Sequence, residues 1–507
     1  MSILMRCAQD WPEKSAAVIA ETGEAITYSN LHARSTRVSA FLAERLQQGE
    51  VIAVFLGNRL EYFEVSFAAR RAGVYYVPVS THLTAAELDY ILKDSGAKVL
   101  FTEDRYLGLF KNLSYDMRAG LEIVSVDDPA YKALATDGPI PPLPARLLGL
   151  DFAYSSGTTG RPKGVRHEMA GDKQLEKAVM TAGWVEFFDL SCESVYLSPA
   201  PLYHAAPLRF SIRCLCNGGT VVVMQKFDAE KALATIARFR VTHSQWVPTM
   251  FIRLLALPES TRRAYDLSSH KMALHAAAPC PIEIKRQMIE WWGNIVWEYY
   301  TGSERAGATT ISAQEWIVRP GSVGQAKQGM LHIVDEQGRE CPPGVEGLVC
   351  FEGGPRFQYH NDPGKTAEAH TSQGWATFGD IGRMDEEGYL YLTDRRSNMI
   401  ISGGVNIYPQ EAENVLLEHP LVHDVAVIGV PHSDFGEEVK GVVELKDPAM
   451  ASEETCALLL TYCREHLSHI KCPRSIDFAS GLPRTETGKL IKRLIRDEYR
   501  AKLTSTQ

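Results

Sequence analysis

Short runs of apolar residues alternate with amphipathic segments through the first half of the chain. The runs form two series, at residues 51–56, 74–79, 98–101 and 123–126, and at residues 194–197, 220–224, 244–248 and 272–275. Segments 61–71 and 84–95, between the runs of the first series, have the spacing of amphipathic helices. Short apolar runs separated by such helices are typical of buried parallel strands. The pattern therefore predicts an α/β fold with βαβ units on mostly parallel sheets.

The pattern changes towards the C-terminus. Residues 138–144 contain four prolines and predict a linker. Beyond residue 324 the chain becomes rich in strand-like segments that are separated by Gly and Pro turns. A compact α/β unit then begins near Asp394, with a helix at 409–418, a strand at 424–430 and a helix at 453–467. We expect a large domain (1–394) of α/β subdomains plus a β-rich part, and a small α/β domain (395–507).

Composition limits the class of protein. With 45% hydrophobic and 23% charged residues, the 507 residues have an ordinary globular composition and the length for two or more domains. The net charge of −9 argues against a nucleic-acid partner. No apolar run approaches ~20 residues, and the N-terminus lacks the apolar core of a secretory signal, so no membrane span is expected. The ten cysteines contain no CxxC pair, which favours reduced thiols in the cytoplasm.

The segment 154–165, Tyr-Ser-Ser-Gly-Thr-Thr-Gly-Arg-Pro-Lys-Gly-Val, is the strongest candidate for chemistry. Its glycines let backbone N–H groups approach an anion, its hydroxyls donate hydrogen bonds, and its lysine adds a positive charge. These are the groups that a polyphosphate requires. The candidate phosphate-binding residues are Ser155, Ser156, Gly157, Thr158, Thr159, Gly160 and Lys163.

The flanking residues predict a strand before this loop, at 148–154, and a helix after it, at 168–184, whose dipole would favour an anion. The loop is not a Walker A motif, because Pro162 and Gly164 stand where that motif has Gly and Ser or Thr. An ordinary P-loop kinase or NTPase is therefore disfavoured.

The loop instead resembles the phosphate-binding loop of the acyl-adenylate-forming superfamily, which includes acyl-CoA synthetases. Six further segments resemble motifs of that superfamily in the same order: Pro-Leu-Tyr-His at 201–204, Tyr-Thr-Gly-Ser-Glu at 300–304, Phe-Gly-Asp at 378–380, Asp-Arg at 394–395, Gly-Gly-Val-Asn-Ile-Tyr-Pro at 403–409 and Pro-Arg-Thr-Glu-Thr-Gly-Lys at 483–489. The series spans most of the chain. Residues 274–281 of this chain, Leu-His-Ala-Ala-Ala-Pro-Cys-Pro, resemble a segment of the branch that contains bile-acid, cycloaliphatic and aryl CoA ligases.

The resemblance implies an AMP-forming acid–thiol ligase that uses ATP, CoA and Mg²⁺. A carboxylate first reacts with ATP to give acyl-AMP and pyrophosphate, and the CoA thiol then takes the acyl group and releases AMP. By the same resemblance Lys489 bridges the substrate carboxylate and the α-phosphate, and the small domain moves on a hinge near 394–397 between the two steps. Gly403 and Gly404 would then line the pantetheine tunnel. His204 would either gate that tunnel or border the acyl pocket.

The resemblance also implies the nucleotide site. Glu304 would hold Mg²⁺, because this ion prefers one or two carboxylates together with phosphate oxygens. Ser303 would contact the α-phosphate. Asp380, expected in a turn, and Arg395 would bind the ribose. The adenine would lie near Tyr299 and Tyr300 on one side and near Ala276, Ala277 and Ala278 on the other.

The chain departs from the superfamily pattern at positions that affect the acyl pocket and the hinge. Thr301 stands where glycine is usual and Ser303 where threonine is usual, and the branched Thr301 makes a long straight alkyl channel at that wall less favoured. Ser397 stands where many members have Lys or Asp. The candidate pocket residues Trp246, Met250, Phe251 and Thr301 favour an apolar acid that contains a ring or is of medium size. Arg209 and Arg213 fit either a second substrate carboxylate or surface bases.

Two other functions remain open. The acceptor could be the phosphopantetheine of a carrier protein rather than free CoA, and a nucleotide-binding regulator without turnover is a second alternative. Retention of Lys163, Glu304, Asp380, Arg395 and Lys489 argues against the regulator. A homodimer is a possible assembly.

Overall fold

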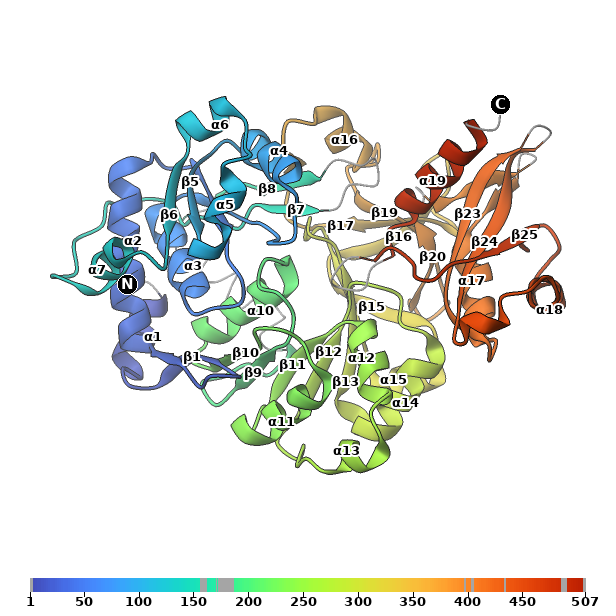
Figure 1. Cartoon of the computed structure of the whole chain (residues 1–507), viewed down its shortest axis with the longest axis horizontal. Helices are drawn as coiled ribbons and strands as arrows, with labels where there is room; N and C mark the ends of the chain where they lie inside the picture. The colour runs from blue at the N-terminus through green and yellow to red at the C-terminus, as the bar shows by residue number, and fades with distance from the viewer. Residues whose placement is uncertain are drawn as a thin grey trace.

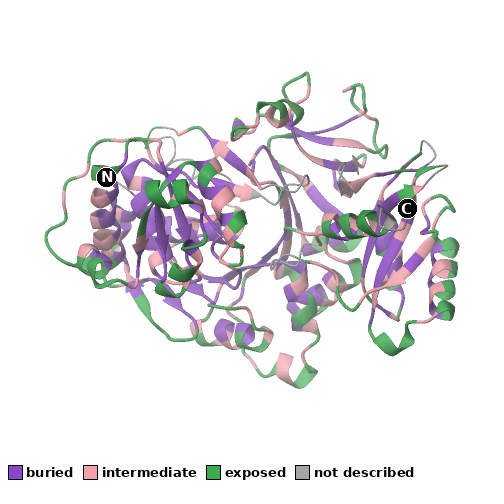
Figure 2. Cartoon of the chain, turned by 45° about the horizontal axis from the view of Figure 1, so that its top comes forward, coloured by how far each residue is buried: buried purple, intermediate pink, exposed green. Residues whose placement is uncertain are grey.

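The computed structural model describes residues 3–155, 162–169, 171, 187–395, 398–402, 405–432, 435–484 and 490–504. The predicted α/β fold is confirmed: a large N-terminal part built from sheets and helices is followed by a small C-terminal α/β domain (Figure 1). Strands are largely buried, whereas loops and the outer faces of helices are exposed (Figure 2). Among the described residues, no helix is both long and apolar enough to cross a membrane.

A long mixed sheet forms the centre of the large part. Within the described residues its strands follow the order β16-β17-β19-β20-β15-β14-β13-β12-β11-β9-β10-β1-β2. The parallel strands are β1 (Ser15–Ile19), β9 (Val195–Ser198), β10 (Thr220–Val223), β11 (His243–Trp246), β12 (Met272–His275) and β13 (Val296–Thr301). The antiparallel strands are β2 (Ala25–Thr27), β14 (Ala308–Ser312), β15 (Ser322–Gln328), β16 (Met330–Val334), β17 (Gly347–Glu352), β19 (Ala376–Met384) and β20 (Leu390–Arg395).

The first series of apolar runs forms a separate parallel sheet of order β4-β3-β5-β6. Its strands are β3 (Val51–Phe55), β4 (Tyr75–Pro78), β5 (Ala97–Thr102) and β6 (Glu122–Ser125). The predicted helices 61–71 and 84–95 appear as α3 (Glu61–Ala72) and α4 (Ala85–Ser95). Helix α4 begins at a capping box between Thr84 and Glu87 and ends at the left-handed Gly96, which explains its sharp limits.

Further helices cover the sheets of the large part. The N-terminal ones are α1 (Ile3–Asp10), α2 (Tyr28–Arg45), α5 (Leu107–Phe110), α6 (Tyr115–Gly120) and α7 (Pro129–Thr136). Those that follow are α10 (Ala205–Cys216), α11 (Ala229–Phe239), α12 (Pro248–Leu255), α13 (Glu259–Arg263), α14 (Ile282–Trp292), α15 (Ala313–Val318) and α16 (Pro363–Glu368).

A small antiparallel sheet of order β18-β8-β7 carries the flanks of the phosphate loop. Its strands are β7 (Ala153–Ser155), β8 (Lys163–His167) and β18 (Phe357–Tyr359). The expected strand before the loop is present as β7, but the helix does not follow the loop directly: Lys163 begins a strand that pairs back onto β7, and Glu168 and Met169 are not helical. Most of the predicted helix 168–184 lies outside the described residues, so the contribution of its dipole stays a prediction.

The C-terminal domain contains the strands β21 (Ile400–Ser402), β22 (Val405–Ile407), β23 (Val422–His432), β24 (Gly436–Leu445) and β25 (Ser475–Phe478). Its helices are α17 (Pro409–Glu418), α18 (Glu453–His466) and α19 (Lys492–Thr504). The predicted helices at 409–418 and 453–467 are thus confirmed almost residue for residue. Buried side chains such as Leu416, Val427 and Leu459 give the domain its own core.

Candidate active site

The carboxyl ends of the parallel strands gather most of the predicted motifs. Residues 201–204 follow β9, residues 276–278 follow β12, and residues 300–304 include the end of β13. Because β9, β11, β12 and β13 are neighbours that run in the same direction, these segments lie at one edge of the sheet. Ligands of open α/β sheets bind at this edge. The topology therefore predicts the site at the ends of β9 to β13.

Glu304 is a buried carboxylate that is oriented by a tyrosine from another strand. The Tyr359 hydroxyl donates a hydrogen bond to its Oε1 at 2.7 Å. The Lys163 ammonium lies 5.4 Å from the centre of the same Tyr359 ring. A ring on β18 thus brings the candidate metal carboxylate and the phosphate-loop lysine together, a contact that the sequence motifs did not indicate.

Position 302, one residue after the usual glycine of the motif, has no room for a side chain. A Cβ atom at position 302 would lie 2.4 Å from Oε2 of Glu304 and 2.7 Å from Cδ1 of Phe378. Any larger residue would therefore displace the carboxylate. Thr301, at the usual glycine position, is exposed, and its hydroxyl donates to the Gly307 carbonyl at 2.7 Å.

Asp380 is held in place by a tyrosine from the neighbouring motif. The Tyr300 hydroxyl donates to Oδ2 of Asp380 at 2.6 Å, and this contact orients the carboxylate. Asp380 lies within strand β19, opposite Arg395 of β20, and not in the turn expected from its sequence. The side chain of Arg395 lies outside the described residues.

The two tyrosines of β13 have different environments because neighbouring strand residues face opposite sides. Tyr299 is buried, packs 5.7 Å from Phe210, and accepts a hydrogen bond from the Gln245 amide. Tyr300 faces Asp380. Ala276 is buried, whereas Ala277 is exposed and has a φ of +77°, a left-handed conformation that costs energy for alanine. Strain of this kind is often found where a ligand binds.

His204 occupies the N-cap position of α10, and its ring centre lies 4.6 Å from that of Tyr203, with the two rings tilted by 56°. Burial lowers the pKa of its imidazole to about 4, so His204 is neutral near pH 7. A neutral imidazole fits a gate or a pocket wall and does not fit a general acid.

Comparison with known proteins identifies the family of the chain. A model of the AMP-binding enzyme family matches residues 4–356, and the model of the AMP-binding enzyme C-terminal domain matches residues 411–489. The chain belongs to the AMP-binding enzyme family. The predicted resemblance to the acyl-adenylate-forming superfamily is thereby confirmed, as is the enzyme class, an AMP-forming acid–CoA ligase with ATP and CoA as co-substrates.

Three relatives illustrate the similarity. A feruloyl-CoA synthase of Amycolatopsis is 33% identical over 96% of this chain and 98% of its own length. A fatty acid–[acyl-carrier-protein] ligase of Streptomyces coeruleorubidus is 31% identical over 95% of this chain and 93% of its own. The crystal structure of ATP-bound MatB from Rhodopseudomonas palustris matches with a TM-score of 0.86 at 29% identity, covering 98% of this chain and 99% of MatB.

Several predicted site residues of this family member lie outside the described residues. They are Ser156, Gly157, Thr158, Thr159 and Gly160 of the phosphate loop, Gly403, Gly404 and Lys489, together with the side chain of Ser155. The ends of the segment that carries Lys489 are described, and both are anchored. Arg484 binds Asp424 with its Nε 2.7 Å from Oδ2, and Lys492 lies 2.8 Å from Oε1 of Glu413.

The candidate acyl-pocket residues divide by environment. Trp246, Met250 and Phe251 are buried in a hydrophobic cluster that includes Trp292, and the Trp246 indole donates to Ser244 at 2.6 Å. Thr301, in contrast, is exposed.

A buried ionic cluster under Ser303 was not found from the sequence. Asp151 accepts hydrogen bonds from Arg209, at 2.8 Å from Nε, and from Arg305. Nη2 of Arg209 also donates to the Ser303 carbonyl at 3.3 Å, and Nε2 of His167 lies 3.4 Å from the same oxygen. Arg209 is thus no surface base: it holds the backbone of the residue whose hydroxyl is expected at the α-phosphate.

Burial and the two arginines of this cluster shift the pKa values of Asp151 and His167. Burial raises the pKa of Asp151, but Arg209 and Arg305 outweigh that effect and hold the pKa well below its usual range. Burial and the same two arginines lower the pKa of His167 to about 4. Near neutral pH the cluster therefore contains a charged aspartate and a neutral histidine.

Replacing Asp151 by asparagine is expected to destabilise the protein by about 3–5 kcal/mol at pH 7, because two arginines lose a buried charged partner. The folded pKa is depressed, so the stabilisation is present above the unfolded pKa of about 3.9 and is lost as the pH falls towards the folded value. Urea unfolding from pH 3 to pH 7 should therefore show the difference between wild type and variant shrinking at the acidic end. A difference independent of pH would contradict this assignment.

Asn58 ties the gate segment to the N-terminal sheet. Its amide nitrogen donates to the carbonyls of Ala200 at 3.1 Å and Met224 at 2.7 Å, and its oxygen accepts from the Leu202 N–H at 2.8 Å. All three partners are backbone groups at the ends of β9 and β10. Asn58 therefore sets the position from which the chain continues to His204.

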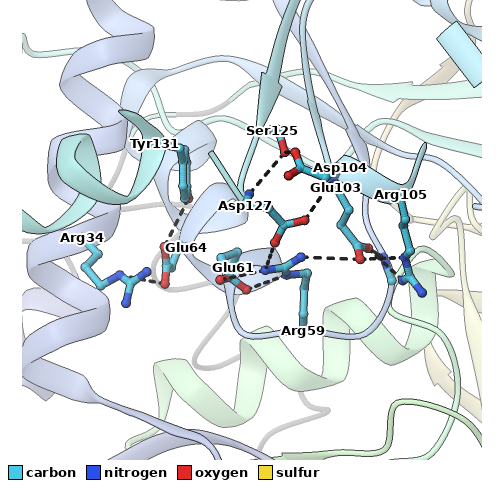
Figure 3. Close-up of polar contacts among 11 residues, drawn as sticks. Arg34, Arg59, Glu61, Glu64, Glu103, Asp104, Arg105, Ser125, Asp127 and Tyr131 are labelled. Carbon is cyan, nitrogen blue, oxygen red and sulfur yellow. Dashed lines mark hydrogen bonds and ion pairs between the residues drawn. The ribbon is translucent and has the colours of Figure 1, made fainter. Parts of the chain in front are cut away.

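The neighbouring Arg59 fixes the turn that carries Asn58 (Figure 3). Its guanidinium lies 2.7 Å from Glu61 and 2.9 Å from Asp127. Glu103, 3.5 Å from Arg59, also accepts from the Gly57 N–H at 2.6 Å. The turn after β3 is thus braced by side chains that follow β5 and β6.

Replacing Asn58 by alanine should leave buried backbone groups without partners, at about 1–3 kcal/mol for each group. We expect lower stability in urea unfolding and a lower kcat/KM for the acid, because the gate segment loses its anchor. Asn30→Ala, at an exposed position of α2, serves as the control and should change neither quantity. Wild-type values for Asn58→Ala would show that the anchor is dispensable.

Proposed function

We propose that this ligase activates an apolar carboxylic acid, ring-containing or of medium size, through an acyl-AMP intermediate and transfers the acyl group to CoA. One observation carries the proposal. At the end of β13, Glu304 accepts from Tyr359, whose ring centre lies 5.4 Å from the Lys163 ammonium. Tyr300 of the same strand donates to Asp380. This arrangement supports a bound ATP, with the proposed metal carboxylate Glu304 and the proposed ribose carboxylate Asp380 both held by residues that β13 brings near each other.

In the first step a carboxylate oxygen of the substrate attacks the α-phosphorus of ATP. The bond from that phosphorus to the oxygen of the β-phosphate breaks, and its electron pair leaves with pyrophosphate. Lys489 would lie between the two anions, lower their repulsion and align them for attack. Ser303 would bind the α-phosphate, with its backbone held by Arg209.

In the second step the CoA sulfur attacks the acyl carbon, and AMP leaves with the oxygen that joined the two groups. Domain 395–507 would rotate against domain 1–394 about residues 394–397. This rotation would withdraw the segment that carries Lys489 and bring the segment with Gly403 and Gly404 into its place. The neutral His204 would border the thiol path without holding a charge there.

Glu304 would hold Mg²⁺. The donor set fits this ion, since Mg²⁺ takes few protein carboxylates and fills its remaining positions with phosphate oxygens and water. No group of three or more His, Cys, Asp or Glu side chains among the described residues could form a protein-only metal site. When bound, the ion would neutralise part of the phosphate charge.

The feruloyl-CoA synthase, named for an aromatic acid, supports a ring-containing substrate. A panel of aryl, cycloaliphatic, medium-chain and long-chain acids tests the proposal. Each is incubated with ATP, Mg²⁺ and CoA, and AMP, pyrophosphate and acyl-CoA are quantified. We expect equal amounts of all three products, with the highest kcat/KM for a ring-containing or medium-chain acid. Long-chain acids as the best substrates would contradict the substrate class, and ADP as the product would contradict the reaction.

A carrier protein is the second candidate acceptor, because the relative from Streptomyces coeruleorubidus is named as an acyl-carrier-protein ligase. The same assay with a phosphopantetheinylated carrier protein in place of CoA separates the two. A higher kcat/KM for the carrier protein than for CoA would favour this second function.

A further inference from the structure

A cavity of about 330 Å³ adjoins the described end of the phosphate loop. Lys163 from β8 and Lys365 from α16 both line it, together with Tyr90, Asp94, Tyr359 and Asp362. Lys365 lies outside the segments that carry the resemblance described above. Its position in this cavity brings a second ammonium to the side of the site where Tyr359 contacts Glu304.

The backbone around Lys365 is fixed by its own turn. The Asp362 side chain accepts from the Lys365 N–H at 3.0 Å and caps α16. The Thr366 hydroxyl donates to the Asp362 carbonyl at 2.9 Å and accepts from the Tyr359 N–H at 3.0 Å. Residues 359–366 therefore form a rigid link from the tyrosine beside Glu304 to Lys365.

The two lysines influence each other directly. Burial, and after it the charge of Lys365, lowers the pKa of Lys163, while Asp362 and Glu304 act in the opposite direction. The Lys365 ammonium lies 3.6 Å from Asp362, and the nearby Asp94 accepts from the Tyr154 hydroxyl at 2.6 Å. Two neighbouring ammonium groups repel each other, and an anion with several oxygens would turn that repulsion into attraction to both.

We propose that Lys365 is a further catalytic residue, which binds the pyrophosphate group together with Lys163. The ligand is the β,γ-diphosphate of ATP before the reaction and inorganic pyrophosphate after it. This inference rests on the proposed adenylation reaction, because only that reaction leaves pyrophosphate at this place.

The role follows from where charge develops. When the α-phosphorus bonds to the carboxylate oxygen, the electron pair of the broken bond remains on the departing pyrophosphate oxygen. An ammonium that is already in place stabilises this charge without rearrangement. No proton transfer is required, so Lys365 remains an ammonium throughout.

Acid-dependent exchange of labelled pyrophosphate into ATP tests the proposal, using the best acid of the panel. We expect Lys365→Met to raise the KM for pyrophosphate about 10-fold or more, as loss of one hydrogen bond to a charged group predicts. Lys365→Arg, which keeps a cation, should retain most of the affinity. Thiolysis of supplied acyl-AMP by CoA should proceed at the wild-type rate in both variants, which also shows that they are folded.

Asp362→Ser is the matched control, because serine can still cap α16 while the carboxylate near Lys365 is removed. Its KM for pyrophosphate should stay at or below the wild-type value. An unchanged KM in Lys365→Met overturns the proposal, as does an equal rise in Asp362→Ser or a slower thiolysis in Lys365→Met. Absence of exchange by the wild type with every acid would instead refute the adenylation reaction itself.

Discussion

Lys489→Met is expected to slow acyl-adenylate formation by about 10²–10³-fold, the usual effect of removing one preorganised group that stabilises transition-state charge. The carboxylate and the α-phosphate are both anions, and this single ammonium is assigned to bring them within bonding distance. Rapid-quench measurement of acyl-AMP in a single turnover gives the rate directly. The ionic anchors Arg484–Asp424 and Lys492–Glu413 flank the segment, so the substitution should leave the fold unchanged.

Two controls accompany this variant. Thiolysis of supplied acyl-AMP should keep its wild-type rate in Lys489→Met, because Lys489 serves only the first step. Lys446→Met, at an exposed position of the same domain, should be unchanged in both steps. Undiminished acyl-AMP formation by Lys489→Met would remove this lysine from the mechanism.

Glu304→Gln should lower the adenylation rate by about 100-fold or more, since metal stabilisation of phosphate charge contributes several kcal/mol. The amide cannot replace the negative charge at the metal, so the Mg²⁺ concentration for half-maximal rate should also rise. Titration with Mg²⁺ at saturating ATP measures both effects.

Tyr359→Phe separates the charge of Glu304 from its orientation. This variant keeps the carboxylate and removes only the hydroxyl that donates to it at 2.7 Å, so we expect a smaller loss of rate than in Glu304→Gln. Glu336→Gln, at an exposed position, is the control and should behave as wild type. An unaltered Mg²⁺ dependence in Glu304→Gln would contradict the metal assignment.

The elements that the sequence predicted well are those with strong periodicity. Helix 409–418 and strand β12 were predicted to within one residue of their observed bounds. An apolar period of 3.6 residues identifies the helix, and a short apolar run identifies a strand at the centre of a sheet. The hairpin of β7 and β8 was missed. Its second strand, Lys163–His167, follows a Gly-rich loop, and its partner β18 lies almost two hundred residues later in the chain.

The site likewise contains residues that the sequence predicted and residues that only the fold brings together. Motif spacing alone indicated Glu304 and Asp380, but the tyrosines that orient them could not be assigned, since Tyr359 and Tyr300 reach them only through strand pairing. The Asp151 cluster joins residues that are 58 and 154 positions apart, and no local pattern connects such residues. Lys365 stands in the one Gly-Lys-Thr of the chain, but Tyr359 occupies the place where a P-loop requires glycine, so no role for this lysine followed from the sequence.

The fate of the substrate's own oxygen tests the central claim most directly. An acid labelled with ¹⁸O in its carboxylate is converted to acyl-CoA, and AMP and pyrophosphate are examined by mass spectrometry. If the carboxylate attacks the α-phosphorus and the thiol then cleaves the acyl–oxygen bond, one labelled oxygen appears in AMP and none in pyrophosphate. Unlabelled AMP together with labelled pyrophosphate would mean that the carboxylate attacks the β-phosphorus, and that an acyl pyrophosphate and no acyl-adenylate lies on the path.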